Sequence, residues 1–503
     1  MLRHAFFVSS VTIAILGLLV SQWTPPTAPR TQTIRQGRNN TVLFLANSEH
    51  GLSNVHVATA YALLEQHPEV EVHYASFPSM GRKLDRVSRR AQQINPSARS
   101  IVYHELPEEL RVTSTAIRSG RSPANLVHAP GLASIKTVTT MMPWIISVWP
   151  GEEHMALFEK TAEVIEEVDP SLIVLEAFLR PSIHAAWNSS RLHAMLSPLT
   201  PIDHFPLYQP YGSWLWKYPV IGSGISFPVP WTRFLENMYI NVRYFYASLR
   251  MANYRDTQKY LESKGLSYPV HWFNLHNPDV PWVFQALPDA SIPVDVIPPN
   301  VTLAGPIILS LSSAQEEAPE LSKWLSRAPT VLVSLGTLFT WTETQAVAMA
   351  QALAEILSWR SDIQVLWKFM RDVDLSGTPT YDDSFLDPLR PYLDSQRLRM
   401  ESWLEVQPVT ILETGHIVLS VHHGGAGCYH EALGGLGVWG CPKASPLWNA
   451  ACLANAFRTI LSNDAYDKVK QKASRFSEMV KSNPGQYVAA REIARLATSG
   501  YAA

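Results

Sequence analysis

The chain has 503 residues, of which 46% are hydrophobic and 17% are charged, and its formal net charge is −2. This length is enough for two large domains or about three small ones, each with a hydrophobic core. The high apolar and low charged content excludes a disordered chain and a highly charged coiled coil, and the near-neutral balance gives no indication of nucleic acid as a partner. Three cysteines late in the chain are too few for a disulfide framework, which favours a reducing compartment.

Residues Ala5–Trp23 form an uncharged and largely apolar stretch near the N-terminus. About 20 such residues cross the hydrocarbon core of a bilayer as a helix, and no good signal-peptide cleavage site follows them. Arg3 precedes the stretch, whereas Arg30, Arg35 and Arg38 follow it. Because positive residues stay on the cytosolic side, the sequence predicts a single-pass membrane anchor and tether over the first 40 residues, with a cytosolic body on the endoplasmic reticulum.

Strands and helices alternate after this tether. TVLFLA (41–46) is expected to be a buried strand, 53–67 a helix and VEVHYASF (70–77) a second strand. A strand–helix–strand unit of this length indicates a parallel sheet. A helix over 152–168 and a strand over 171–178 continue the pattern.

The middle of the chain has a different character. Residues 206–231 are rich in aromatic, Pro and Gly residues without a regular period, and a helix is expected at about 234–263. A Pro cluster over 291–306 indicates a linker. We therefore expect a first domain over 41–290 and a second domain over 307–503.

The alternation returns after the linker. Strands are expected at TVLVSLGT (330–337) and IQVLWKF (363–369), with a helix over 342–359 between them. HIVLSVHHGGAG (416–427) is expected to be a strand that runs into a Gly-rich loop. The predicted fold class is thus α/β, with two Rossmann-like parallel domains that face a cleft, where ligands bind at the carboxyl ends of the strands.

Two polar residues follow strands of the first domain. His50 comes after the first strand and Glu176 ends the strand over 171–178, so both are expected at the same edge of the sheet. An imidazole backed by a carboxylate is the general base that deprotonates an alcohol. A purely structural histidine is the more common alternative, and His56 is a rival six residues later.

The Gly-rich loop of the second domain connects a strand to a helix. Glycines let the backbone approach an anion, and the free N–H groups at the start of the helix attract phosphate. In HHGGAGCYHE (422–431), His423 is placed to donate to a phosphate and Glu431 to accept from a ribose diol. Thr337, which ends the SLGT turn, is expected to face the same phosphates. A tight turn whose glycines serve packing alone is the alternative.

Four stretches together resemble the fungal UDP-glycosyltransferases of glycosyltransferase family 1, which have the GT-B fold. They are NSEHGLSNVHVATAYALL, WKYPVIGSGISFPVPW, VLVSLGT, and the run from SWLEVQPVT to HHGGAGCYHEAL. The resemblance extends from about residue 40 to the C-terminus, and it implies that His50 is the catalytic base, with Glu176 in place of the supporting Asp. It implies that Trp403 stacks on uracil. The implied nucleotide contacts are Thr337, Trp403, Gln407, His423, Gly425, Gly427, Cys428 and Glu431.

The chain departs from this family after Gly435. The family has a strand there, followed by a turn with an acidic residue that holds the sugar hydroxyls, whereas EALGG (431–435) runs directly into LGVWGCPK. Asn449 and Ala450 offer no carboxylate if they are aligned with that turn instead. The departure indicates either a shortened gene model or a defective enzyme, so a nucleotide-binding pseudoenzyme is the alternative function.

Metal chemistry is a rival hypothesis. Asp372 and Asp374 form the Asp-x-Asp pattern with which metal-dependent glycosyltransferases hold Mn²⁺ or Mg²⁺, although a solvated loop is expected here. His422, His423 and His430 do not have the spacing of a structural zinc site. We therefore expect neither a metal nor another cofactor.

The resemblance implies a UDP-sugar-dependent hexosyltransferase, with UDP-glucose as the expected donor. It would invert the anomeric carbon while transferring the hexose to a hydroxyl of a lipophilic small molecule. The aromatic residues of 206–231 favour an apolar acceptor pocket, and their chief members are Trp214, Trp216, Phe227 and Trp231. The expected partners are the donor, this acceptor and a membrane, and not nucleic acid.

Overall fold

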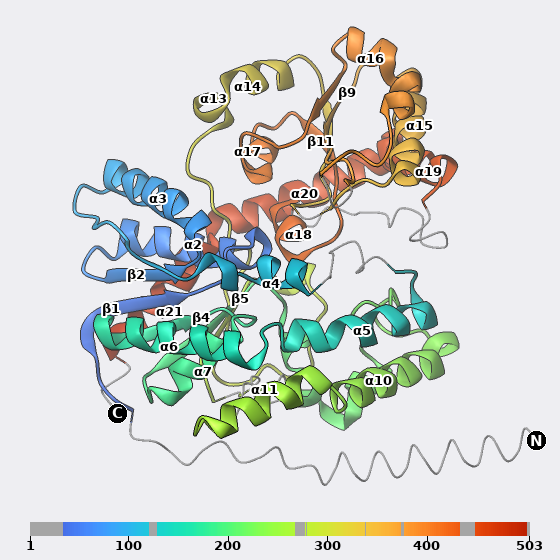
Figure 1. Cartoon of the computed structure of the whole chain (residues 1–503). Helices are drawn as coiled ribbons and strands as arrows, with labels where there is room; N and C mark the ends of the chain where they lie inside the picture. The colour runs from blue at the N-terminus through green and yellow to red at the C-terminus, as the bar shows by residue number, and fades with distance from the viewer. Residues whose placement is uncertain are drawn as a thin grey trace, which may run out of the picture.

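The computed structural model describes residues 34–119, 128–266, 277, 279–337, 339–373, 377–432 and 448–499. These residues form two sheets, one of seven strands and one of four, and every strand pair in both sheets is parallel. We call each sheet with its covering helices the first and the second domain; Figure 1 shows them one below the other. The predicted α/β class with parallel sheets is confirmed.

The strand order of the first sheet is β3-β2-β1-β4-β5-β6-β7, so the order reverses between β1 and β4. β1 and β4 are buried over most of their length because helices cover both faces of a parallel sheet. The expected strands near residues 41, 70 and 171 correspond to β1, β2 and β4. The strands are β1 (Arg38–Leu45), β2 (Glu71–Ser76), β3 (Val102–Glu105), β4 (Pro170–Leu175), β5 (His193–Ser197), β6 (Trp282–Phe284) and β7 (Val301–Leu303).

Side chains of β1 alternate between the two hydrophobic cores of the first domain. Val42 and Phe44 pack on one face of the sheet, and Leu43 and Leu45 pack on the other. The first face is covered by α2 (His50–Gln66), α3 (Gly81–Ile94) and α21 (Gly485–Ser499). The opposite face is covered by α6 (Gly151–Val168) and α7 (Arg180–Asn188).

The aromatic middle of the chain lies outside these two layers. Residues 206–231 form short helical turns and irregular backbone, as their lack of period predicts. The single helix expected over 234–263 is instead two helices, because Met251 is extended (φ −68°, ψ 108°) and its side chain is buried. The remaining α-helices of the first domain are α4 (Val112–Arg118), α5 (Ser134–Ile146), α8 (Pro201–His204), α9 (Ser213–Trp216), α10 (Phe234–Ser248) and α11 (Ala252–Ser263).

The second sheet has the order β10-β9-β8-β11, which reverses between β8 and β11. Its strands are β8 (Thr330–Val333), β9 (Gln364–Lys368), β10 (Leu398–Glu401) and β11 (Ile417–Val421). β8 and β9 are fully buried, whereas all five residues of β11 are half-exposed. The predicted loss of a strand after Gly435 falls on residues 433–447, which lie outside the described part of the chain.

Helices surround the second sheet as well. The long helix expected over 342–359 is α15, and the helix expected after the Gly-rich loop is α18. The helices are α13 (Ala314–Glu317), α14 (Pro319–Leu325), α15 (Glu343–Trp359), α16 (Arg390–Asp394), α17 (Pro408–Leu412), α18 (Ala426–Ala432), α19 (Ala450–Leu461) and α20 (Asn463–Ser482).

Two segments assigned to the linker and the second domain from sequence contribute to the first domain. β7 lies inside the Pro-rich stretch 291–306 and pairs with β6. The last helix, α21, places its small apolar residues in the core beneath β1. The hydroxyl of Tyr487 in α21 also donates to Glu65 Oε2 in α2 at 2.8 Å. Figure 1 shows α20 crossing towards the first domain, where α21 lies beside β1.

The predicted membrane span, Ala5–Trp23, lies outside the described residues. Among the helices of the described ranges, none is both long enough and apolar enough to cross a bilayer. This finding contradicts the predicted localisation as a single-pass protein with a cytosolic body on the endoplasmic reticulum. We therefore withdraw that localisation, and the membrane as a partner stays a prediction.

The cysteines also differ from expectation. Cys428 in α18 is a free thiol. Cys452 in α19 is disulfide-bonded, so the expectation of reduced cysteines is wrong for this residue.

Candidate active site

The predicted site residues follow the strands at which each sheet reverses its order. His50 begins α2 shortly after β1, and Glu176 directly follows β4. In the second domain, Thr337 and His423 follow β8 and β11. Open α/β sheets bind their ligands at such switch points, beyond the carboxyl ends of the strands. The fold therefore places both groups of predicted residues where a ligand is expected.

The imidazole of His50 faces the second domain. Its ring centroid lies 6.4 Å from that of Trp403, which follows β10. Burial, together with the cations of Lys83 and Lys368, lowers the pKa of His50 to about 4, although a hydrogen bond with Asn54 opposes the shift. At neutral pH the ring is thus uncharged, which is the form that accepts a proton from an alcohol.

Glu176 is fully buried, and its hydrogen bonds go to neighbours other than His50. Asn47 Nδ2 donates to Glu176 Oε2 at 2.5 Å, and the backbone N–H of Phe178 donates to Oε1 at 2.8 Å. Burial raises the pKa of Glu176 to about 7, although these bonds and the charge of Arg180 oppose the rise. None of the hydrogen bonds within the described ranges joins Glu176 to His50, so this pairing stays a prediction.

A second carboxylate, next to His50 in the sequence, was not predicted. Glu49 precedes His50 directly, and Thr113 Oγ1 donates to its Oε1 at 3.2 Å. Burial raises the pKa of Glu49, and its charge contributes to the raised pKa of Glu176. A charged residue soon after a buried apolar strand is the sequence signal that could have identified it.

A lysine in the second domain was also not predicted. Lys368 is the last residue of β9 and is only 6% exposed. Its Nζ donates to the backbone oxygen of Gly336 at 3.0 Å and lies 4.0 Å from the centroid of the Trp403 ring. The signal for it in the sequence is a cation at the end of an otherwise apolar strand.

Glycines of two neighbouring segments make room for His423: Gly336 in the turn after β8, and Gly425 in the predicted phosphate loop. A Cβ atom on Gly336 would lie 2.8 Å from His423 Cε1, and one on Gly425 would lie 2.2 Å from His423 Nε2. Cys428 Sγ is 3.7 Å from His423 Nδ1, which places the thiol beside the same ring. At Gly427 nothing lies within 4 Å of an added Cβ. Two of these glycines therefore permit the close approach of an exposed imidazole to the loop.

Residues of both domains meet at one small cavity. Glu431 of α18 lines it together with His50 and Asn54 of α2, and the cavity measures about 10 Å³. Burial raises the pKa of Glu431, and the cation of Lys83 opposes this. A volume of this size is room for about one water molecule, so the two halves of the site are in close contact.

The remaining predicted nucleotide contacts lie on the same side of the second domain. Trp403 is 51% exposed, which leaves part of its ring free to stack. Gln407 is half-buried and precedes α17, four residues after Trp403. Thr337 is half-buried in the turn after β8. The structure thus brings Trp403 to His50, and it brings His423, Gly425 and Cys428 to one another.

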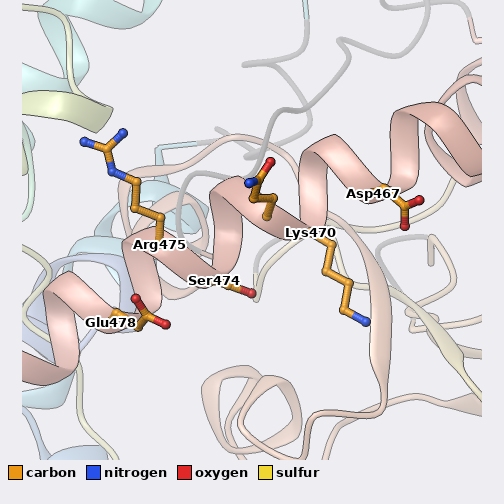
Figure 2. A pocket seen from close by; sticks show the side chains of 6 residues that line it. Asp467, Lys470, Ser474, Arg475 and Glu478 are labelled. Atoms are coloured by element: carbon orange, nitrogen blue, oxygen red, sulfur yellow. The ribbon is translucent and has the colours of Figure 1, made fainter.

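A wider hollow of about 480 Å³ lies along α20 (Figure 2). Its lining consists of Asp467, Lys470, Gln471, Ser474, Arg475 and Glu478. All six residues belong to one helix, and two acidic residues flank two basic ones along it. Because no second element of the described chain contributes a side chain, the hollow has no converging polar groups of the kind that fix a ligand.

The described residues give little support to the metal hypothesis. Asp372 Oδ1 accepts a hydrogen bond from Thr340 Oγ1 at 3.2 Å, and Asp374 lies outside the described residues. Within the described ranges, no three or more His, Cys, Asp or Glu side chains are grouped so that they could hold a metal ion. The expected independence from metal and cofactor stays a prediction.

The aromatic residues expected to line the acceptor pocket do not gather into one. Trp231 is 88% exposed and Trp216 is 41% exposed, so both rings face solvent to a large extent. Phe227 stacks on Tyr218 with ring centroids 5.4 Å apart. The aromatic content of 206–231 indicates an irregular segment, but it does not specify which rings pack together.

No protein-family profile matches the sequence. A curated relative does match: glycosyltransferase sdnJ of Sordaria araneosa is 32% identical over 404 residues, which cover 78% of this chain and 77% of that protein. The chain belongs to the glycosyltransferases. The predicted enzyme class, a glycosyltransferase, is thereby confirmed.

Solved structures show that this glycosyltransferase has the GT-B fold. The glycosyltransferase of kitacinnamycin covers 92% of this chain and 99% of its own, with a TM-score of 0.52 at 15% identity. A UDP-glucosyltransferase from Polygonum tinctorium covers 92% and 99%, with a TM-score of 0.54 at 14% identity. A UDP-glucose:anthocyanidin 3-O-glucosyltransferase in complex with UDP covers 92% and 100%, with a TM-score of 0.51 at 14% identity.

Proposed function

We propose that this glycosyltransferase transfers a hexose from a UDP-sugar to a hydroxyl of a lipophilic small molecule, with inversion and without a metal ion. The observation that carries the proposal is the uncharged imidazole of His50, which faces Trp403 of the other domain across the cleft. A base on one domain and an aromatic platform on the other are the parts that a two-substrate transferase needs. The structurally similar enzymes named above for UDP-glucose chemistry, one of them with UDP bound, support the choice of donor.

On the acceptor side, His50 takes the proton of the acceptor hydroxyl. The acceptor oxygen forms a bond to the anomeric carbon, while the bond from that carbon to the phosphate oxygen breaks and its electron pair leaves with UDP. Attack from the face opposite the leaving group inverts the configuration through an oxocarbenium-like state. Glu176 is assigned the role of supporting the imidazolium that forms.

On the donor side, Trp403 stacks on uracil and Glu431 accepts from the ribose diol. The diphosphate meets N–H and hydroxyl donors, which stabilise the charge of the leaving group in the way a metal ion does in other enzymes. Gln407 lies beside Trp403 in sequence and is assigned to the nucleoside. The residues assigned to the diphosphate are Thr337, His423, Gly425, Gly427 and Cys428.

Substrate entry requires the cleft to widen. The cavity between His50 and Glu431 has room for about one water molecule, which is far less than a nucleotide sugar needs. Closing the cleft over bound substrates would then exclude water from the reacting carbon and prevent hydrolysis of the donor.

A nucleotide-binding protein without transfer activity is the second candidate. The sequence favours it, because EALGG (431–435) runs directly into LGVWGCPK without the acidic sugar-holding turn. If the acidic sugar-holding turn is missing, UDP and UDP-glucose should bind with similar affinity. If another group holds the hexose, UDP-glucose should bind more tightly and turn over.

Calorimetric titration with UDP and UDP-glucose, combined with a transfer assay on a panel of hydroxylated lipophilic compounds, tests the proposal. We expect UDP binding, and transfer that His50→Ala reduces by about 10²–10⁴-fold while UDP affinity is unchanged. His67→Ala, at the far end of α2, is the matched control and should retain full activity. Absence of UDP binding to the wild-type protein, or full transfer by His50→Ala, would refute the proposed function.

A further inference from the structure

The buried lysine at the end of β9 takes no part in the steps above. Lys368 reaches from its strand towards two neighbouring loops of the second domain. Its Nζ is bound to Gly336 in the turn after β8, and it lies over the ring of Trp403 after β10. The ammonium group is thus held in place by three adjacent strands at the ligand-binding edge of the sheet.

This cation has no anionic partner in the protein as described. Lys368 belongs to none of the ion pairs of the described residues, and burial lowers the pKa of its ammonium group. One carbonyl oxygen and one aromatic face satisfy only part of an ammonium group with three N–H donors. Burying such a charge without a counter-ion is costly, and an anionic ligand would offset that cost.

The surroundings of Lys368 indicate which anion this is. Trp403, the platform assigned to uracil, lies directly under the ammonium group. The charge of Lys368 acts on His50, which serves the reacting carbon, and it interacts with Cys428 of the phosphate loop. In a nucleotide sugar the diphosphate connects the nucleoside to the hexose, so its path runs between these groups.

We propose that Lys368 is a further catalytic residue, which binds the diphosphate of the donor and stabilises the negative charge on the departing UDP. This inference rests on the proposed function and adds to it the cation that a metal-free site needs. The ammonium group keeps its proton throughout: the electron pair of the broken bond stays on the phosphate oxygen, and the acceptor proton goes to His50. A fixed positive charge of this kind stabilises the leaving group without reorganisation during the reaction.

The structural alternative is that Lys368 only supports the Trp403 ring from below. The two roles differ in what they predict for a ligand that has uracil but no phosphate. A supporting role affects uridine and UDP equally, because both stack on Trp403. A diphosphate role affects UDP and leaves uridine unchanged.

Calorimetric titration of uridine and UDP into the full-length protein separates these roles. We expect Lys368→Met to weaken UDP binding about 10- to 100-fold, the effect of losing one charge-assisted hydrogen bond, and to change uridine binding by less than about twofold. Lys368→Arg keeps the charge and should retain most of the preference for UDP. Lys323→Met, which removes an exposed lysine of α14, is the matched control for the loss of one charge.

Equal weakening of uridine and UDP in Lys368→Met would overturn the inference in favour of the supporting role, and unchanged UDP affinity would overturn it outright. A wild-type protein that binds uridine but not UDP would also overturn it, whereas binding of neither would refute the proposed function itself. Circular dichroism establishes that each variant is folded. If Lys368→Met is not, Lys368→Gln provides the same comparison, because its amide can still donate towards Gly336.

Discussion

Alanine at Gly336 should destabilise the second domain through two separable effects. The backbone there has φ +90°, a conformation that costs a residue with a Cβ about 1–2 kcal/mol. The new Cβ would also lie 2.8 Å from His423 Cε1, and because this is the far end of an exposed side chain, relieving the contact costs about 1 kcal/mol. We therefore expect Gly336→Ala to lower the free energy of unfolding by about 2–3 kcal/mol.

The Gly-rich loop after β11 and the start of α18 supply controls that isolate each effect. Gly424 has φ +77° but nothing within 4 Å of an added Cβ, so Gly424→Ala should show the backbone cost alone. Gly425 has the contact without the positive φ, since its Cβ would lie 2.2 Å from His423 Nε2. Gly427 has neither and lies in α18, so Gly427→Ala should stabilise the domain by about 0.5–1 kcal/mol.

Denaturant unfolding followed by tryptophan fluorescence measures these differences. Because a protein with two sheets can unfold in more than one step, the transition that responds to UDP should be assigned to the second domain first. When the His423→Ala variant is the background, Gly336→Ala should lower the free energy of unfolding by the backbone cost alone, because the clash with the imidazole is gone. The reasoning is refuted if Gly336→Ala and Gly424→Ala are equally stable, or if removing the imidazole recovers nothing.

Four further predictions concern ligand binding, pH, metal and the last helix. Glu431→Ala should weaken UDP binding by about 1–3 kcal/mol, measured by calorimetry, because a ribose diol loses its acceptor in a largely buried site; an unchanged affinity would exclude Glu431 from the nucleotide site. The profile of kcat/KM against pH should rise near pH 4, where His50 loses its proton, and again near pH 7, where the carboxyl of Glu176 ionises. Glu176→Gln should remove the rise near pH 7 and keep the one near pH 4. A rise near pH 7 that persists in the variant would show that another group causes it. EDTA should leave UDP binding and transfer nearly unchanged, and a loss restored by Mn²⁺ would contradict metal independence. Ile493→Ala should destabilise the first domain by about 2–5 kcal/mol in denaturant unfolding, whereas an effect confined to the UDP-responsive transition would place α21 with the second domain.

Long, strongly patterned elements of the fold could be predicted from the sequence. β1 and β4 are continuous apolar runs, because strands in the middle of a parallel sheet are buried on both faces. β6 and β7 have three residues each, which is too short to show a period, and β7 lies among prolines. The position of α21 could not be predicted either, since its apolar stripe does not specify which sheet it covers.

The candidate site also has a part that could be predicted from the sequence and a part that could not. His50 and Glu176 could be placed at one edge because each follows a strand of the same parallel sheet. The proximity of Trp403 to His50 depends on how two domains meet, and no local pattern contains that information. The hydrogen bonds of Glu176 to Asn47 and Phe178 likewise depend on side-chain packing, which is why its pairing with His50 was the simpler expectation.

The return of the chain to the first domain restricts how the two halves of the cleft can move. Two described segments pass between the domains: the one that follows β7 and the one that ends in α21. A body attached at two points rotates readily about the line that joins them, while sliding or twisting strains one attachment. Substrate entry should therefore follow a single hinge axis. His50 and Glu431 share their cavity with residues 307–309 of the first crossing segment, so residues of the cleft farther from that segment should separate more than these two.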